Sequence, residues 1–291
     1  MKLCDRQDFD DPALRERIRS IVPGLQPEEE LHRKLWEYAV LTMFLEEVGA
    51  LDEETEVLSV GAGHEEVLYW LANRVGRVVA TDIYGEGGFA GREAAASMLT
   101  DPSAFAPYPY REDRLEVFTM DARRLEFPNE SFDVVFSLSS IEHFGSSVDI
   151  AQSAREMGRV LRPGGHAFVV TECFLRRHPL NSRLLHTAIR LATLGRLATG
   201  ATPRHRAIEV FTPGELQRQI VGPSGLELVQ PLTLDISPES WENVQSWVGD
   251  HHEPAQRKPF PHIVLDIRGR FPFKTYGAPW TSAGLAMRKR R

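Results

Sequence analysis

Cysteine, long apolar runs and an excess of positive charge are all scarce in this sequence. With two cysteines in 291 residues, the chain has no disulfide framework, which predicts a reducing compartment. No apolar run approaches the ~18 residues of a transmembrane helix, and the N-terminus lacks the apolar core of a signal peptide. The 34 lysines and arginines stand against 41 acidic residues, a formal net charge of −7. We therefore expect a cytoplasmic protein with no membrane span and no nucleic-acid partner.

The most informative stretch is 56–63, where a short β-rich run ends in two glycines. Its apolar residues are typical of a strand buried on both faces. Gly61 and Gly63 allow a sharp turn and a close approach of the backbone to a ligand. Apolar residues at helical spacing follow in 64–73. The stretch predicts the strand–turn–helix unit of a nucleotide-type fold, although a tight turn alone would show the same two glycines.

Two acidic features narrow the choice of cofactor. The dinucleotide fingerprint requires a third glycine where Glu66 stands, and Glu65 and Glu66 begin the helix at which a pyrophosphate would bind. Carboxylates there repel phosphate but suit a phosphate-free cofactor with a positive sulfonium, which is S-adenosylmethionine. Acidic residues also stabilise helix N-termini when no ligand is present, by up to ~1 kcal/mol, because they interact favourably with the helix dipole. Asp82 ends the next apolar run at about the position of a ribose-binding acid.

Strands and helices alternate along most of the chain, which predicts a parallel sheet. In such sheets ligands bind beyond the carboxyl ends of the strands, and Gly63, Asp82, Asp121 and the 139–144 stretch all fall there. The expected strands are 57–60, 78–81, 115–120, 132–138, 166–171, 226–234 and 282–287, with a helix at about 148–161 between the fourth and the fifth.

The chain divides into an N-terminal part, residues 1–50, and a main domain, residues 51–291. Residues 1–27 are polar and interrupted by prolines, which predicts a mobile or wrapping arm, and 28–48 reads as an amphipathic helix that caps the cofactor cleft.

Three insertions interrupt the main domain, at about 83–113, 172–206 and 235–280. The first is long enough for a functional loop and fits a short helix at 92–99. The second is interpreted as a lid over the substrate, or as a surface helix pair without a ligand role. The third is aromatic and is a candidate substrate wall.

Five motifs in this order and spacing resemble the class I S-adenosylmethionine-dependent methyltransferases. The resemblance covers roughly 56–172 and, more weakly, 210–234 and 281–288. It implies an α/β fold with a Rossmann-like, seven-stranded, mostly parallel sheet, helices on both faces and an antiparallel last strand. The motifs are Val57–Gly63, Thr81-Asp82, Met120-Asp121-Ala122, Phe132–Phe136 and Val160–Gly165.

The resemblance assigns roles to residues at the strand ends. Gly61 and Gly63 would line the methionine portion of the cofactor, and Asp82 would hold the ribose. Asp121 would accept the adenine amino group, with Ala122 beside it. In the same way, Ser137 with the leucine that follows it would form the floor of the cleft.

A second resemblance concerns the acceptor. Residues 139–145, together with Tyr84 and the 83–113 insertion, are similar to bacterial methyltransferases of glycan assembly, including those that methylate sugar hydroxyls of polysaccharide precursors. The Asn-Pro-Pro-aromatic motif of amino-group methyltransferases does not follow the fourth strand. The sequence therefore predicts O-methylation of a sugar or oligosaccharide precursor, and it leaves open another small-molecule acceptor and a homodimer.

An alcohol is a poor nucleophile while protonated, so a general base should assist the transfer. His143 follows the fourth strand where the acceptor should lie, and an ordinary histidine pKa of about 6.5 suits this role. Glu142 could orient His143 or contact a sugar hydroxyl. The alternative is a structural His143 that caps the following helix. His178, His205 and Glu209 are reserve candidates for the base.

Metal assistance and two other protein classes are alternatives to O-methylation by a general base. Glu142, His143, Asp149 and the trio 251–253 carry metal-ligating side chains, but their spacing is not diagnostic, so we expect no metal. A nicotinamide-dependent oxidoreductase would share the glycine turn and Asp82, but Glu66 argues against it. A non-catalytic protein that binds S-adenosylmethionine remains the third possibility.

Overall fold

The computed structural model describes residues 2–28, 32–175, 191, 210–242, 244–248, 263–268, 275–276 and 280–291. The strands are β1 Glu56–Val60, β2 Arg77–Asp82, β3 Leu115–Thr119, β4 Phe132–Leu138, β5 Leu161–Phe174, β6 Glu227–Leu228, β7 Val244–Val248, β8 Ile263–Arg268, β9 Thr275–Tyr276 and β10 Trp280–Arg288. The α-helices are α1 Pro12–Ile21, α2 Arg33–Glu47, α3 Glu66–Ala72, α4 Ser147–Val160, α6 Pro213–Leu216 and α7 Gly222–Ser224. Among these, no helix is long and apolar enough to cross a membrane.

The strands form one sheet in the order β3-β2-β1-β4-β5-β10-β8-β7, with β6 paired to β10 and β9 to β8. From β3 to β5 every pairing is parallel, whereas β10 runs antiparallel to both β5 and β6. The expected Rossmann-like, mostly parallel sheet with an antiparallel last strand is therefore confirmed.

The C-terminal half of the sheet differs from the prediction in two ways. The strand predicted over 226–234 was too long, because the strand itself covers only Glu227–Leu228, paired with Met287 and Arg288 of β10, and Thr233 makes no more than an isolated bridge with Lys2. The 235–280 insertion adds strands instead of only loops: β8 pairs with β10 at one position and with β7 along its length. The sheet thus extends beyond the seven-stranded core to ten strands.

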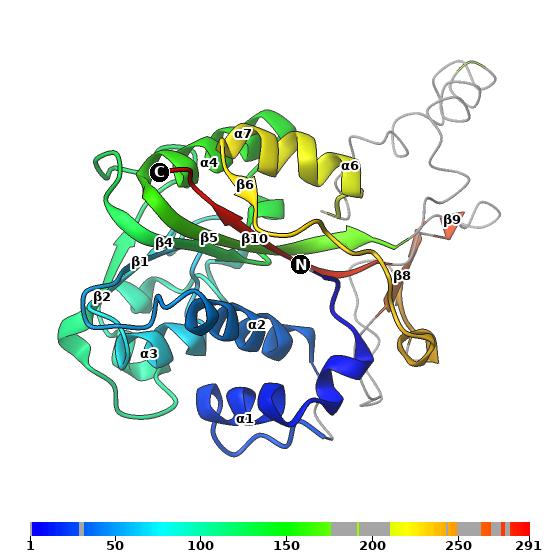
Figure 1. The fold of residues 1–291 in the computed structure, drawn as a ribbon, viewed down its shortest axis with the longest axis horizontal. Coiled ribbons are helices and arrows are strands. Elements are labelled where there is room, and N and C mark those ends of the chain that lie inside the picture. Colours follow the sequence, from blue (N-terminus) through cyan, green and yellow to red (C-terminus); the bar gives the residue numbers. More distant parts are fainter. Residues whose placement is uncertain are drawn as a thin grey trace.

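Helices cover both faces of the sheet (Figure 1). α1, α2 and α3 lie on one face, and α4, α6 and α7 lie on the other. Each face has its own apolar core. Val57 and Val78 point into the first core, and Leu58 and Val79 into the second, as the alternation of side chains along a strand requires. The predicted helices on both faces are confirmed.

The N-terminal arm wraps the protein, and the alternative of a mobile segment is wrong. Leu3 pairs with Ala283 of β10, and the Phe9 ring is fully buried. Asp8 accepts a hydrogen bond of 2.6 Å from the indole of Trp36 on α2. The arm is therefore bound to β10 and to α2, which itself begins at Arg33, later than the predicted 28–48 helix.

The 83–113 insertion folds back over the glycine turn. Tyr84 donates a hydrogen bond of 2.6 Å to the carbonyl oxygen of Gly63. The helix predicted at 92–99 was wrong, since only a short 3₁₀ turn, Ala96–Leu99, forms. In the 172–206 insertion, the first residues belong to β5, and the predicted lid lies outside the described residues apart from residue 191.

Candidate functional site

The glycine turn between β1 and α3 is shaped by backbone conformation and by close packing. Gly61 and Gly63 have φ angles of 71° and 50°, which favour glycine. A Cβ on Gly61 would lie 2.6 Å from that of Ser140, and one on Gly63 would lie 2.8 Å from the carbonyl oxygen of Glu93. The turn therefore needs glycine at both positions, and the chain segments after β4 and within the insertion lie against it.

Asp82 is held directly against this turn. Its carboxylate accepts hydrogen bonds from the backbone N–H of Gly63 at 2.9 Å and of Ile83 at 2.7 Å. Burial raises the pKa of Asp82 although both N–H groups oppose the shift. Each carboxylate oxygen keeps a further lone pair. The predicted neighbours Gly63 and Asp82 are thus brought together in a position where the carboxylate can accept ribose hydroxyls.

Asp121 and Ala122 follow the end of β3 at the same edge of the sheet. The backbone N–H of Met120 donates to the carbonyl oxygen of Asp82 at 2.9 Å, which ties the ends of β2 and β3 together. The half-exposed carboxylate of Asp121 is bound by the Arg123 guanidinium, which lowers its pKa. Ala122 is buried. The role of Arg123 was missed in the sequence, where it is one of many surface arginines.

Ser137 lies on β4 and is fully buried inside the sheet. Within the described part of the chain, its hydroxyl oxygen has no hydrogen-bond partner. The next residue, Leu138, ends the strand with a carbonyl oxygen that accepts from Lys34 at 2.9 Å and from Ser140 at 3.1 Å. The backbone at this strand end thus takes part in the polar contacts around the glycine turn.

His143 ends the short helical turn Ile141–His143, between the 83–113 insertion and α2. Its ring centroid lies 4.8 Å from that of Phe89 in the insertion. His143 is exposed at the surface, yet the protein packed around its imidazole, and next the charge of Arg33, lower its pKa to about 4. The expected pKa near 6.5 is therefore wrong, and the imidazole is neutral at physiological pH.

Glu142 is buried and accepts a hydrogen bond of 2.7 Å from the hydroxyl of Thr171 on β5. Burial, and next the nearby Glu172, raise its pKa well above the ordinary value. Its burial therefore favours the protonated carboxyl group.

The described residues contain no group of three or more His, Cys, Asp or Glu side chains arranged to hold a metal ion. The trio 251–253 and the reserve bases His178, His205 and Glu209 lie outside the described ranges.

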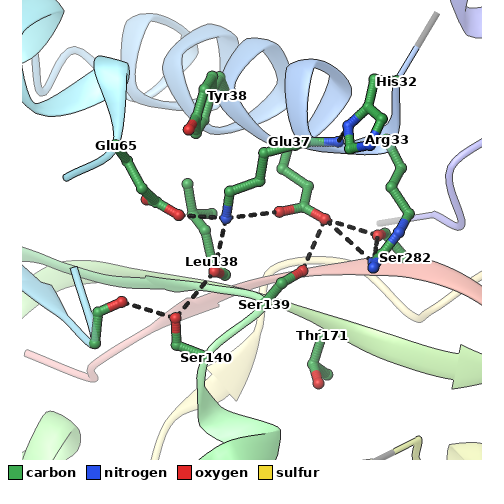
Figure 2. Close-up of polar contacts among 12 residues, drawn as sticks. His32, Arg33, Glu37, Tyr38, Glu65, Leu138, Ser139, Ser140, Thr171 and Ser282 are labelled. Carbon is green, nitrogen blue, oxygen red and sulfur yellow. Dashed lines mark hydrogen bonds and ion pairs between the residues drawn. The ribbon is translucent and has the colours of Figure 1, made fainter. Parts of the chain in front are cut away.

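The first turns of α2 supply charged residues that sequence reasoning missed (Figure 2). Glu37 accepts hydrogen bonds from Ser139 at 2.7 Å and from Ser282 at 2.8 Å. Burial opposes its ionisation, but Lys34, Arg33 and the two hydroxyls together lower its pKa. Ser139 itself has a φ of 49°, a rare conformation for serine that such contacts maintain. The available signal was three charged residues at the start of a helix whose middle, residues 38–45, carries no charge.

These residues fit S-adenosylmethionine. A carboxylate beside the glycine turn suits the ribose, and the carboxyl groups from α2 and α3 suit a cationic sulfonium. Residues 58–169 match the family model of a methyltransferase domain. The sheet order and this match together support a class I methyltransferase domain in this part of the chain, with S-adenosylmethionine as its cofactor.

Known proteins resemble the chain in sequence or in fold. Methyltransferase GfsG of Streptomyces halstedii is 32% identical over 110 residues, which are 38% of this chain and 35% of that protein. The match thus spans about a third of its length. The structure of geranyl diphosphate methyltransferase in complex with S-adenosylmethionine is 14% identical, covers 92% of each chain and has a TM-score of 0.51. A putative methyltransferase from Bacillus halodurans C-125 is 19% identical over 86% of this chain and 98% of its own, with a TM-score of 0.48. At these identities, the structural likeness concerns the fold alone.

Proposed function

We propose that this protein is an S-adenosylmethionine-dependent O-methyltransferase that acts on a hydroxyl of a sugar or oligosaccharide precursor. The observation that supports methyl transfer most strongly is the hydrogen bond between Asp82 and the N–H of Gly63, which joins the ribose-binding acid to the glycine turn. The sugar acceptor rests on the sequence resemblance of residues 139–145 and of the 83–113 insertion, which contact each other through the rings of His143 and Phe89.

The cofactor, when bound, supplies an activated methyl group on a positive sulfur. The protein's first task is to hold the acceptor oxygen in line with that methyl group, opposite the sulfur. Such alignment lowers the barrier by on the order of 7–11 kcal/mol. Gly61, Gly63 and Asp82 would fix the cofactor, and the chain after β4 would place the acceptor.

His143 would take the proton of the acceptor hydroxyl as the new bond forms. Its low pKa keeps the imidazole neutral and able to accept a proton at physiological pH, but it also makes the imidazolium a strong acid. The proton should therefore pass on quickly to another group. Glu142 would act indirectly, by tying the turn that carries His143 to Thr171.

The test has two arms. Calorimetry with S-adenosylhomocysteine measures cofactor binding, and mass spectrometry of a bacterial glycan-precursor pool, incubated with protein and S-adenosylmethionine, seeks a gain of one methyl group per product. Binding with a methylated sugar supports the proposal. Binding with a methylated acceptor that is no sugar would overturn the sugar class, and binding without turnover on any pool would indicate a non-catalytic cofactor-binding protein.

A further inference from the structure

Four glutamates meet two cations at the carboxyl ends of β4 and β5, beneath the start of α2. Each glutamate comes from a different element of the fold, so the grouping is invisible in the sequence. We call the four glutamates the carboxyl cluster. It consists of Glu37 on α2, Glu65 at the start of α3, Glu142 after β4 and Glu172 on β5, and its cations are Arg33 and Lys34 of α2.

The two cations leave part of this negative charge uncompensated. Arg33 binds Glu172 at 2.6 Å and lies 3.7 Å from Glu37. Lys34 lies 3.3 Å from Glu37 and also contacts Glu65. Four carboxyl groups therefore face two cations, and a surplus of two buried negative charges would be very costly.

Three carboxyl oxygens of the cluster also lack hydrogen bonds. Within the described residues, Oε1 of Glu142, Oε2 of Glu65 and Oε2 of Glu37 are buried and have no hydrogen-bond partner, although the Glu37 oxygen lies 3.3 Å from the ammonium of Lys34. The Glu142 side chain is only 1% exposed, so bulk water does not satisfy it. Burial raises the pKa of Glu65 to about 7, and burial also raises the pKa values of Glu142 and Glu172. Glu65 therefore exchanges a proton near neutral pH, and the raised pKa values of Glu142 and Glu172 favour protonation where the charge surplus is otherwise unfavourable.

The carboxyl cluster adjoins the cofactor turn. Lys34 donates to the Leu138 carbonyl oxygen at 2.9 Å, and Ser140 joins that same oxygen to the carbonyl oxygen of Gly61, at 3.1 and 2.7 Å (Figure 2). Glu65 stands at the N-cap position of α3, the helix that follows Gly63, without a capping hydrogen bond from its side chain. A positive charge bound at the glycine turn would therefore lie next to the uncompensated carboxyl groups.

We propose that the carboxyl cluster is a proton store that responds to the charge of the cofactor. Binding of the sulfonium expels a proton from the cluster, and methyl transfer, which leaves a neutral thioether, allows the cluster to take up the proton that the acceptor hydroxyl loses. This inference rests on the proposed function.

The step balances in atoms and electrons. The acceptor oxygen forms a bond to the methyl carbon, the carbon–sulfur bond breaks, and its electron pair stays on sulfur. The hydroxyl proton goes to His143 and then to a carboxylate of the cluster. The charges of Arg33 and Lys34, which are the cations of the cluster, contribute to the lowered pKa of His143.

The test compares the cationic cofactor with its neutral product. Calorimetry near neutral pH, in two buffers of different ionisation enthalpy, measures the protons released on binding. S-adenosylmethionine should release up to about one proton more than S-adenosylhomocysteine, because both carry the same amino-acid and nucleoside parts and differ in the charge on sulfur. Equal proton release for the two ligands in the wild-type protein would overturn the proposal.

Substitutions within the carboxyl cluster test whether the released proton comes from it. Glu65→Gln and Glu142→Gln each retain the shape of the protonated carboxyl group and should reduce the difference in proton release. Glu47→Gln, at the exposed end of α2, is the matched control and should retain it. An unchanged difference in both cluster variants would place the store elsewhere and overturn the assignment. If neither ligand binds the wild-type protein, the proposed function itself fails, which is a different result from binding with equal proton release.

Discussion

At the scale of one side chain, a substitution of Asp82 tests the proposed cofactor site. Replacing it with alanine removes the carboxylate that would accept ribose hydroxyls beside Gly63. A charge-assisted hydrogen bond contributes about 1.5–3 kcal/mol, so Asp82→Ala should weaken S-adenosylhomocysteine binding roughly ten- to a hundredfold by calorimetry. The exposed Asp113→Ala variant is the control. Unchanged affinity in a folded Asp82→Ala protein would disprove the assignment.

His143 tests the chemistry at the same scale. His143→Ala should lower kcat by about 10²-fold or more and leave cofactor affinity nearly intact, because the base acts only as the new bond forms. With a pKa of about 4, the imidazole is neutral above that pH. The rise in activity that reflects its deprotonation should therefore lie near pH 4, well below the ordinary histidine range.

Two results would assign His143 another role. Loss of cofactor binding or of thermal stability in His143→Ala would make the residue structural. Full turnover in the variant would mean that another base or a metal assists the proton transfer, and His178 and Glu142 would be replaced next.

At the scale of elements, α2 begins with an unusual cap. His32 accepts a hydrogen bond from the backbone N–H of Lys34 through Nδ1, at 3.2 Å, which requires an unprotonated nitrogen. Although His32 is exposed at the surface, the protein around its imidazole, and next the charge of Arg33, lower its pKa to about 4.

The cap therefore predicts a pH-dependent stability. Because the folded-state pKa lies below the unfolded value of about 6.5, the contribution is complete above pH 6.5 and is lost as the pH falls towards 4. His32→Asn keeps a capping oxygen without this titration, so its melting temperature should fall less between pH 7 and 5 than that of the wild type. The same fall in both proteins would contradict the prediction.

The N-terminal arm is the second element with a measurable contribution. Phe9 is fully buried between the arm and the rest of the first core. Phe9→Ala should reduce the free energy of unfolding by about 3–5 kcal/mol in urea titrations. The neighbouring, exposed Gln7→Ala variant should change it by less than about 0.5 kcal/mol. A Phe9→Ala loss as small as the control would mean that the arm detaches readily in solution.

At the scale of the whole molecule, the cofactor should stabilise the folded state. A ligand that binds only the folded protein adds about 2.7 kcal/mol at a hundred times its Kd. S-adenosylhomocysteine should therefore raise the free energy of unfolding, and a nicotinamide dinucleotide at the same concentration should not. Stabilisation by the dinucleotide instead would favour an oxidoreductase.

The sequence by itself determined the parallel half of the sheet and the cofactor turn. Gly61, Gly63 and Asp82 lie within one strand–helix–strand unit, so local patterns of burial and turn chemistry predict their meeting. The alternation of strands and helices likewise predicted α4 and β4 almost to the residue. Such features depend on residues close in sequence, which is why periodicity can predict them.

Only the tertiary structure decided what surrounds that turn. The arm lies along β10, the 235–280 insertion lengthens the sheet, and Glu37 binds both Ser139 and Ser282. The carboxyl cluster and the low pKa of His143 arise in the same way. Burial and the electrostatic field at a side chain depend on all the elements packed around it, so no local pattern in the sequence contains them.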